Sequence, residues 1–195
     1  MLFDIGGVLA EFAGIAMLRR LSGAETDLEA ATQWLMSPWV RRFESGQCSE
    51  QEFAAGVVAE LRFPFTPAEF LEHFLAWLSG PFAGAEEMVR ETAERVAVGC
   101  LSNTNALQWR RIIAHWPLTD LFEHRFLSFE LGAVKPDPEI YELVAGRLPV
   151  APGHVLFLDD NPMNVSGALA AGLQAECVLG VGDARATLKA RGLLS

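Results

Sequence analysis

Five short apolar runs, each ended by polar residues or glycine, constrain the fold more than any other feature of the sequence. These runs are MLFD, VAVGCLSN, HRFLSFELG, HVLFLDD and, more weakly, AECVLGVGD. Helical patterns separate most of them. This alternation predicts an α/β fold built on a doubly wound parallel sheet, in which helices cover both faces.

The helices expected between the runs have clear start and stop signals. They span residues 85–95, 105–115, 138–147 and 162–171, and a last short helix starts at Asp183. Asp137 and Pro138 supply an N-cap and an N1 proline for the third helix. Gly172 is a natural stop residue for the fourth.

The segment between the first two runs has a different character. It shows no strand signal but three patterns typical of capping boxes, Thr26…Glu29, Ser49…Glu52 and Thr66…Glu69. Apolar residues recur in it at helical spacing. We therefore expect a helical-bundle cap domain over residues 13–83, inserted after strand 1 of a core domain made of residues 1–12 and 84–195. The flanking stretches EFAG and SGPFAG are candidate hinges.

Charge and cysteine usage exclude several classes of function. The net charge of −10 disfavours nucleic acid as a partner, because binding its backbone needs clustered Lys and Arg. The three cysteines are scattered, lack the spacing of a zinc site and read as reduced thiols. Neither a signal peptide nor a membrane-length apolar stretch is visible. We expect a cytoplasmic protein without membrane contact, as a monomer or a homodimer.

The residues that end the apolar runs are the candidates for chemistry, because ligands bind at the carboxyl ends of the strands in an open parallel sheet. These positions hold Asp4, Ser102 with Asn103, Lys135, and Asp159 with Asp160. Each residue alone is most often a turn cap, a helix cap or a solvated loop charge. Only their combination favours a functional site.

Two adjacent acids at one strand end favour a metal site. Like charges raise each other's pKa unless a cation compensates them, and hard oxygen ligands suit Mg²⁺. Asp159 and Asp160 therefore indicate a magnesium site. A carboxylate nucleophile, a metal, a hydroxyl and a lysine are together the groups that phosphoryl transfer requires.

Four motifs follow one another in the order Asp-x-x-Gly-Val, Leu-Ser-Asn-Thr-Asn, Lys-Pro-Asp and Leu-Asp-Asp-x-x-x-Asn. In this order they resemble the haloacid dehalogenase (HAD) superfamily over essentially the whole chain. FESGQCSEQEF and FLSFELGAVKPDPEIY are most similar to the subgroup with α-glucose-1-phosphate phosphatase and the soluble epoxide hydrolase phosphatase domain. The resemblance implies a Rossmann-like core with an inserted cap, and a Mg²⁺-dependent phosphatase of small phosphorylated metabolites.

The resemblance also assigns a role to each position. Asp4 is the nucleophile that forms an aspartyl-phosphate, which water then hydrolyses. The implied phosphate-binding residues are Ser102, Asn103 and Lys135. The implied metal ligands are Asp4, the backbone carbonyl of Gly6, Asp160, and Asp159 directly or through water. Asn164 would orient a metal-bound water.

Gly6 stands where most phosphatases of this superfamily have a second acid, which protonates the leaving oxygen and later activates water. Losing such help costs roughly 10²–10⁴ in rate. The subgroup named above also uses glycine here, so the loss is compatible with activity. An anomeric oxygen is a better leaving group than an ordinary alcohol, so an enzyme without this acid is expected to lose least on sugar 1-phosphates or acyl phosphates.

The cap is expected to select the substrate. The stretch SPWVRRFESGQCSEQEF places Trp39, Arg41, Arg42 and Glu44 on a short helix ended by Gly46. Arg41 and Arg42 are candidates for binding a sugar or a distal anion. The more ordinary interpretation is a bundle helix with Trp39 and Phe43 facing inward and solvated arginines.

Three other functions remain open at this stage. A 2-haloacid dehalogenase would also use Asp4, but attack on carbon needs no metal, and Asp159 with Asp160 weighs against it. A phospho-signalling receiver would carry its acidic pair at the first strand. A catalytically weak or silent HAD-like binding protein is supported by Gly6 alone.

Overall fold

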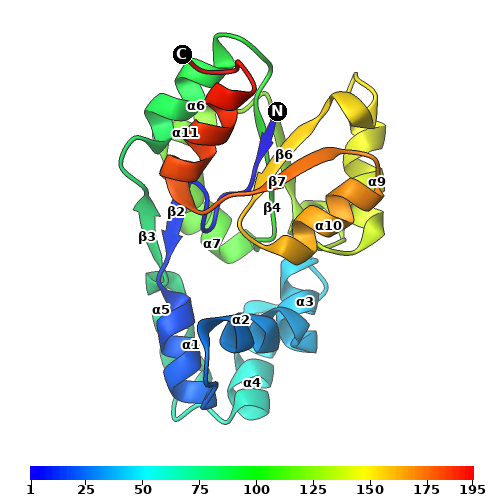
Figure 1. Cartoon of the computed structure of the whole chain (residues 1–195). Coiled ribbons are helices and arrows are strands. Elements are labelled where there is room, and N and C mark those ends of the chain that lie inside the picture. Colours follow the sequence, from blue (N-terminus) through cyan, green and yellow to red (C-terminus); the bar gives the residue numbers. More distant parts are fainter.

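The computed structural model describes residues 1–195 and contains the expected parallel sheet, with strand order β5-β4-β1-β6-β7 (Figure 1). The short central strand β1 pairs with β4 at Leu2↔Gly99 and with β6 at Leu2↔Phe157. The α/β fold with a doubly wound parallel sheet is therefore confirmed. The strand bounds are β1 (Leu2–Phe3), β4 (Gly99–Ser102), β5 (His124–Leu127), β6 (Leu156–Asp159) and β7 (Gln174–Cys177).

Helices cover both faces of this sheet, because successive side chains of each strand point to opposite faces and both sets are apolar. Phe3, Cys100 and Leu158 belong to an apolar cluster with residues of α6, α7 and α11, whereas the neighbouring Leu2 and Leu101 belong to a cluster with residues of α9 and α10. These two groups of helices lie on opposite faces of the sheet (Figure 1). The helix bounds are α6 (Ala85–Ala93), α7 (Ala106–Arg111), α8 (Ser128–Leu131), α9 (Pro138–Arg147), α10 (Pro162–Ala170) and α11 (Gly180–Ala190). Short 3-10 turns lie at Ile113–His115, Pro117–Leu121 and Pro152–His154.

Five helices within residues 14–76 form a separate layer of structure, here called the helical unit: α1 (Gly14–Ser22), α2 (Asp27–Met36), α3 (Pro38–Glu44), α4 (Glu50–Leu61) and α5 (Pro67–Ala76). It packs around its own aromatic cluster, in which Phe43 stacks on Phe53 with ring centroids 4.2 Å apart. The helical unit lies against the carboxyl ends of the core strands (Figure 1).

No helix of the chain has the length and apolar composition needed to cross a bilayer.

Two of the three expected capping boxes are confirmed. Ser49 with Glu52 and Thr66 with Glu69 each make both reciprocal hydrogen bonds at the starts of α4 and α5. The third is half formed: the Thr26 hydroxyl accepts from the Glu29 N–H, but the Glu29 carboxylate accepts from the backbone N–H of Glu25 instead.

The expectation that no strand lies within residues 13–83 is wrong. The two candidate hinge stretches pair as antiparallel strands, β2 (Ala10–Phe12) with β3 (Leu78–Pro81), and join the helical unit to the core. Trp77 packs edge-on against Phe12 beside this pair, with ring centroids 5.9 Å apart. Strands this short form only because the chain returns alongside itself, so local sequence carries no signal for them.

Phe53→Ala should destabilise the helical unit by about 3–5 kcal/mol, because it removes a fully buried ring that contacts Trp34, Phe43, Phe70 and Phe74. Urea unfolding followed by tryptophan fluorescence measures the change. A loss below about 1 kcal/mol would contradict this packing.

Candidate active site

The structure brings the acidic, hydroxyl and lysine candidates together at the carboxyl edge of the sheet. Asp4 follows β1, where its N–H donates to the Leu158 carbonyl at 2.8 Å. Ser102 ends β4, Asp159 ends β6, and Lys135 follows α8. These residues are far apart in sequence and meet because parallel strands end at the same edge.

The buried ammonium group of Lys135 links two of the carboxylates. Its Nζ lies 2.9 Å from Asp4 Oδ1 and 2.6 Å from Asp159 Oδ2, and it donates to the Leu101 carbonyl at 3.1 Å. The Lys135 side chain is only 1% exposed. Burial acts to lower the pKa of Lys135, but the charges of Asp159 and Asp4 outweigh it and raise that pKa above its ordinary value.

Asn103 fixes the loop that carries Lys135. Its Oδ1 accepts from the Lys135 backbone N–H at 2.8 Å, and its Nδ2 donates to the Lys135 carbonyl at 2.9 Å. Asn103 was expected to bind phosphate directly. Its amide is instead committed to positioning Lys135, while a direct phosphate contact stays a prediction.

Asp159 is satisfied by protein groups on both carboxylate oxygens. Besides Lys135, Asn164 Nδ2 donates to its Oδ1 and Oδ2 at 3.0 and 3.1 Å, and the Asn161 N–H donates to Oδ1 at 2.8 Å. Asn164 Oδ1 is buried without a hydrogen-bond partner. Asn164 therefore orients Asp159 with its amide nitrogen and keeps an acceptor oxygen free beside the acids.

The acidic cluster has the donor set of a hard-cation site. Carboxylate oxygens of Asp4, Asp159 and Asp160 lie within 4.8 Å of one another. A side chain at Gly7 would collide with Asp160, because a Cβ there would lie 2.1 Å from its Oδ2, and Gly7 also has a φ of +73°. These groups fit Mg²⁺, which takes carboxylates and water as ligands.

Burial and mutual repulsion hold the pKa values of these acids high. Burial raises the pKa of Asp4 to about 7, Lys135 lowers it, and the charges of Asp159 and Asp160 raise it. Burial and the Asp159 charge raise the pKa of Asp160 to about 6. A cation between these carboxylates would favour their charged forms.

A cavity of about 780 Å³ opens between this cluster and the helical unit. Its core end is polar and includes Asp4, Ser102, Lys135 and Asp160. Its other end is largely apolar, with walls that include Phe12, Ile15, Trp34, Leu35, Phe74 and Phe82. A phosphate at the core end would leave the rest of a substrate in contact with the helical unit.

Neither Arg41 nor Arg42, the two candidates for binding a sugar or a distal anion, lines this cavity, so their contact with substrate stays a prediction. Arg41 forms an ion pair with Asp137 at the start of α9. Arg42 lies over the Trp39 ring at 5.0 Å from its centroid. Both arginines are therefore used in packing, and Arg41 joins the helical unit to the core.

Glu44, the last residue of α3, does line the cavity, although the sequence pattern predicts no role for it. It is half-buried, and burial raises its pKa to about 7, with Lys135 lowering it and Asp4 raising it. The SxxE pattern that follows it marks the start of α4 but gives no sign that Glu44 faces the core. Only the tertiary structure shows that Glu44 lines the cavity.

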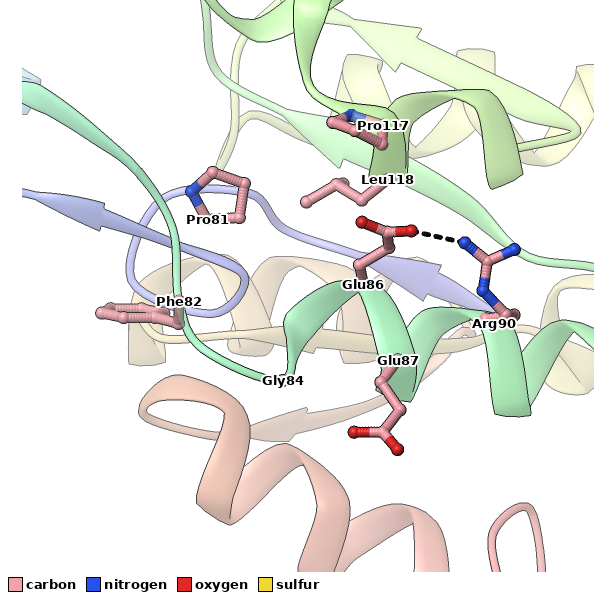
Figure 2. A pocket seen from close by; sticks show the side chains of 8 residues that line it. All are labelled: Pro81, Phe82, Gly84, Glu86, Glu87, Arg90, Pro117 and Leu118. Carbon is pink, nitrogen blue, oxygen red and sulfur yellow. Dashed lines mark hydrogen bonds and ion pairs between the residues drawn. The ribbon is translucent and has the colours of Figure 1, made fainter.

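A second pocket of about 430 Å³ lies on the outer side of α6, next to Pro117 and Leu118 (Figure 2). Its charged residues are Glu86, Glu87 and Arg90, and Arg90 is paired with Glu86 (Figure 2). None of the Asp4 cluster lines it, so we assign the chemistry to the larger cavity.

The sequence matches the model of a family described as haloacid dehalogenase-like hydrolase over residues 1–172. The chain belongs to this family. A phosphatase from Mycobacterium tuberculosis is 28% identical over 95% of this chain and 89% of its own length. A (S)-2-haloacid dehalogenase from a Pseudomonas species is 32% identical, over only 46% of this chain and 38% of its own length.

Solved structures of the family share the fold. A HAD family enzyme from Bacteroides thetaiotaomicron, in complex with magnesium and inorganic phosphate, superposes with a TM-score of 0.71 at 22% identity. The alignment covers 91% of this chain and 92% of that one. The expected superfamily is thus confirmed, whereas the subgroup with α-glucose-1-phosphate phosphatase stays a prediction.

Mg²⁺ should stabilise the protein more at pH 8 than at pH 5. The folded-state pKa values of Asp4 and Asp160 are raised, so the folded protein binds more protons than the unfolded chain between about pH 4 and 7. The free energy of unfolding of the metal-free protein therefore falls as the pH rises through this window. At pH 8 both carboxylates are ionised and can bind Mg²⁺, whereas at pH 5 protons occupy them. Mg²⁺ at about 100 times its Kd contributes about 2.7 kcal/mol. This corresponds to a Tm increase of roughly 5–10 °C for a chain of this size.

Differential scanning fluorimetry with and without Mg²⁺ measures this effect. The matched variant Asp160→Asn removes one charge from the cluster, so it should raise the metal-free Tm at pH 8 and lose most of the Mg²⁺ response. An unchanged Mg²⁺ response in that variant would contradict the metal site.

Proposed function

We propose that this hydrolase is a Mg²⁺-dependent phosphatase that cleaves a small phosphorylated metabolite through an aspartyl-phosphate on Asp4. The observation that carries the proposal is that Asp4, Ser102, Lys135 and Asp160 line the polar end of one cavity. The similarity to a phosphatase over nearly the whole chain supports it. The magnesium and phosphate bound by a protein of the same fold are consistent with it.

In the proposed reaction Asp4 attacks phosphorus while the bond to the leaving oxygen breaks. Lys135 Nζ, 2.9 Å from Asp4 Oδ1, favours the ionised nucleophile and reduces its repulsion of the incoming anion. Ser102 Oγ makes only a 3.5 Å contact with the Asn103 carbonyl, so its hydroxyl is available to a phosphoryl oxygen. Water then attacks phosphorus and releases phosphate and Asp4.

Mg²⁺ would be held by Asp4, Asp160 and the carbonyl of Gly6, with Asp159 adjacent. When bound, it neutralises charge on the phosphoryl oxygens. A dehalogenase reaction would not need this ion, so dependence of activity on Mg²⁺ separates the two functions.

Asp4→Asn should lower Mg²⁺-dependent phosphate release by at least ~10³-fold, because the amide does not form the phospho-intermediate. A screen of phosphorylated metabolites with inorganic phosphate detection measures this. Asp120→Asn, at an aspartate whose side chain is 87% exposed, is the matched control and should retain activity. Phosphate release that survives Asp4→Asn would refute the nucleophile assignment.

Within this function, a sugar 1-phosphate is the candidate that Gly6 favours, because its anomeric oxygen leaves more readily. Glucose 1-phosphate should then give a higher kcat/KM than glucose 6-phosphate, measured at equal Mg²⁺ concentration. Equal or faster turnover of the 6-phosphate would contradict this preference.

The apolar end of the cavity favours a second candidate, a phosphate monoester with an apolar body. Phe12, Ile15 and Leu35, which are only partly buried, offer apolar surface for such a group. Including a prenyl phosphate and an aryl phosphate in the same screen tests which kind of leaving group the cavity accepts.

A further inference from the structure

The Asp4 loop has room for the acid that Gly6 lacks. A Cβ at Gly6 would meet no atom within 4 Å, and this position does not have a positive φ. Neither packing nor backbone strain therefore requires glycine here. At the next position, Gly7, a side chain is excluded, because a Cβ there would lie 2.1 Å from Asp160 Oδ2. The open space beside Gly6 faces the cavity that the loop lines together with Glu44.

The carboxylates that line the cavity divide into three kinds. Asp4 and Asp160 belong to the metal-binding cluster. Glu11 and Asp27 are exposed, and Asp27 pairs with Arg19. Glu44 is the half-buried carboxylate among those that the helical unit contributes, and the charges of Lys135 and Asp4 both act on it.

Helix α3 is anchored so that its end faces the core. Arg41, one turn before Glu44, is paired with Asp137, and α3 contacts α8. Two residues after Glu44, Gly46 has a φ of +71°, and a Cβ there would lie 2.7 Å from the Phe129 carbonyl oxygen of α8. A larger residue would push this turn away from the core, so glycine permits the close approach.

We propose that Glu44 is the catalytic proton donor and acceptor of the phosphatase reaction, supplied by the helical unit in place of a side chain at Gly6. In phosphoryl transfer the attacking and leaving oxygens lie roughly in line across phosphorus. With Asp4 attacking from the core, the leaving oxygen points away from the core, toward the helical unit where Glu44 lies. This assignment rests on the proposed phosphatase function.

The proton balance closes over the two steps. In the first step the Asp4–phosphorus bond forms, the bond to the leaving oxygen breaks, and that oxygen takes the proton of Glu44. In the second step the ionised Glu44 takes a proton from water as its oxygen bonds to phosphorus and the Asp4–phosphorus bond breaks. Glu44 is thereby protonated again for the next turnover.

The surroundings of Glu44 suit this double role. No hydrogen bond fixes its protonation state, and the charges that act on it are Lys135 and Asp4 from the core and Arg41 from its own helix. Burial raises its pKa to about 7, so both forms are populated near neutral pH. An acid–base catalyst is most effective when its pKa lies near the working pH.

The test compares two leaving groups at fixed pH and saturating Mg²⁺. Phenyl phosphate releases a basic phenolate that needs a proton, whereas 4-nitrophenyl phosphate releases a stable anion that does not. Glu44→Gln should lower kcat/KM for phenyl phosphate by about 10²–10⁴-fold, and that for 4-nitrophenyl phosphate by less than about 10-fold. Glu72→Gln, at an exposed glutamate of α5, is the matched control and should change neither value.

A rescue variant separates proton transfer from a structural role. Because a side chain at Gly6 meets open space, adding Gly6→Asp to Glu44→Gln should restore much of the lost phenyl phosphate activity. Equal losses of both substrates in Glu44→Gln would overturn the assignment and leave Glu44 a packing residue. If the unmodified protein and Asp4→Asn release phosphate equally from both esters, the phosphatase function itself fails, independently of Glu44.

Discussion

The ion pairs of the buried Lys135 ammonium group are the interaction on which the carboxyl edge of the sheet depends. Asp4 and Asp159 end neighbouring strands, and their carboxylates would repel each other in a dry environment without the cation between them. Removing one partner of such a buried pair typically costs 3–5 kcal/mol. In the proposed reaction, the same contacts that let these strands end side by side would also favour the ionised form of Asp4 and reduce its repulsion of an incoming anion.

The two asparagines next to Lys135 and Asp159 hold these residues in position. Asn103 holds its backbone, and Asn164 holds the carboxylate of Asp159. This leaves Ser102 Oγ, the second carboxylate oxygen of Asp4 and the carboxylate of Asp160 available to a ligand. The arrangement separates residues that build the site from residues that would touch substrate.

The helical unit completes this site from the opposite side. The paired strands β2 and β3 connect it to the core, and the Arg41–Asp137 ion pair fixes α3 near the acidic cluster. The helical unit thus lines the cavity with the half-buried carboxylate of Glu44 and with a largely apolar wall. In the proposed reaction the core holds the phosphate, while the helical unit contacts the leaving group and supplies its proton.

The sequence by itself determined the sheet, most helices and the core residues of the site, because each depends on a local pattern: an apolar run ended by Asp4, Ser102 or Asp159, or a capping box at Ser49 or Thr66. Tertiary structure decided what depends on contacts between distant segments. It paired the hinge strands, used Arg41 and Asn103 as supports, and placed Glu44 in the lining of the cavity that also includes Asp4. No local pattern encodes which face of α3 meets the core, since that follows from how two separately packed units fit together.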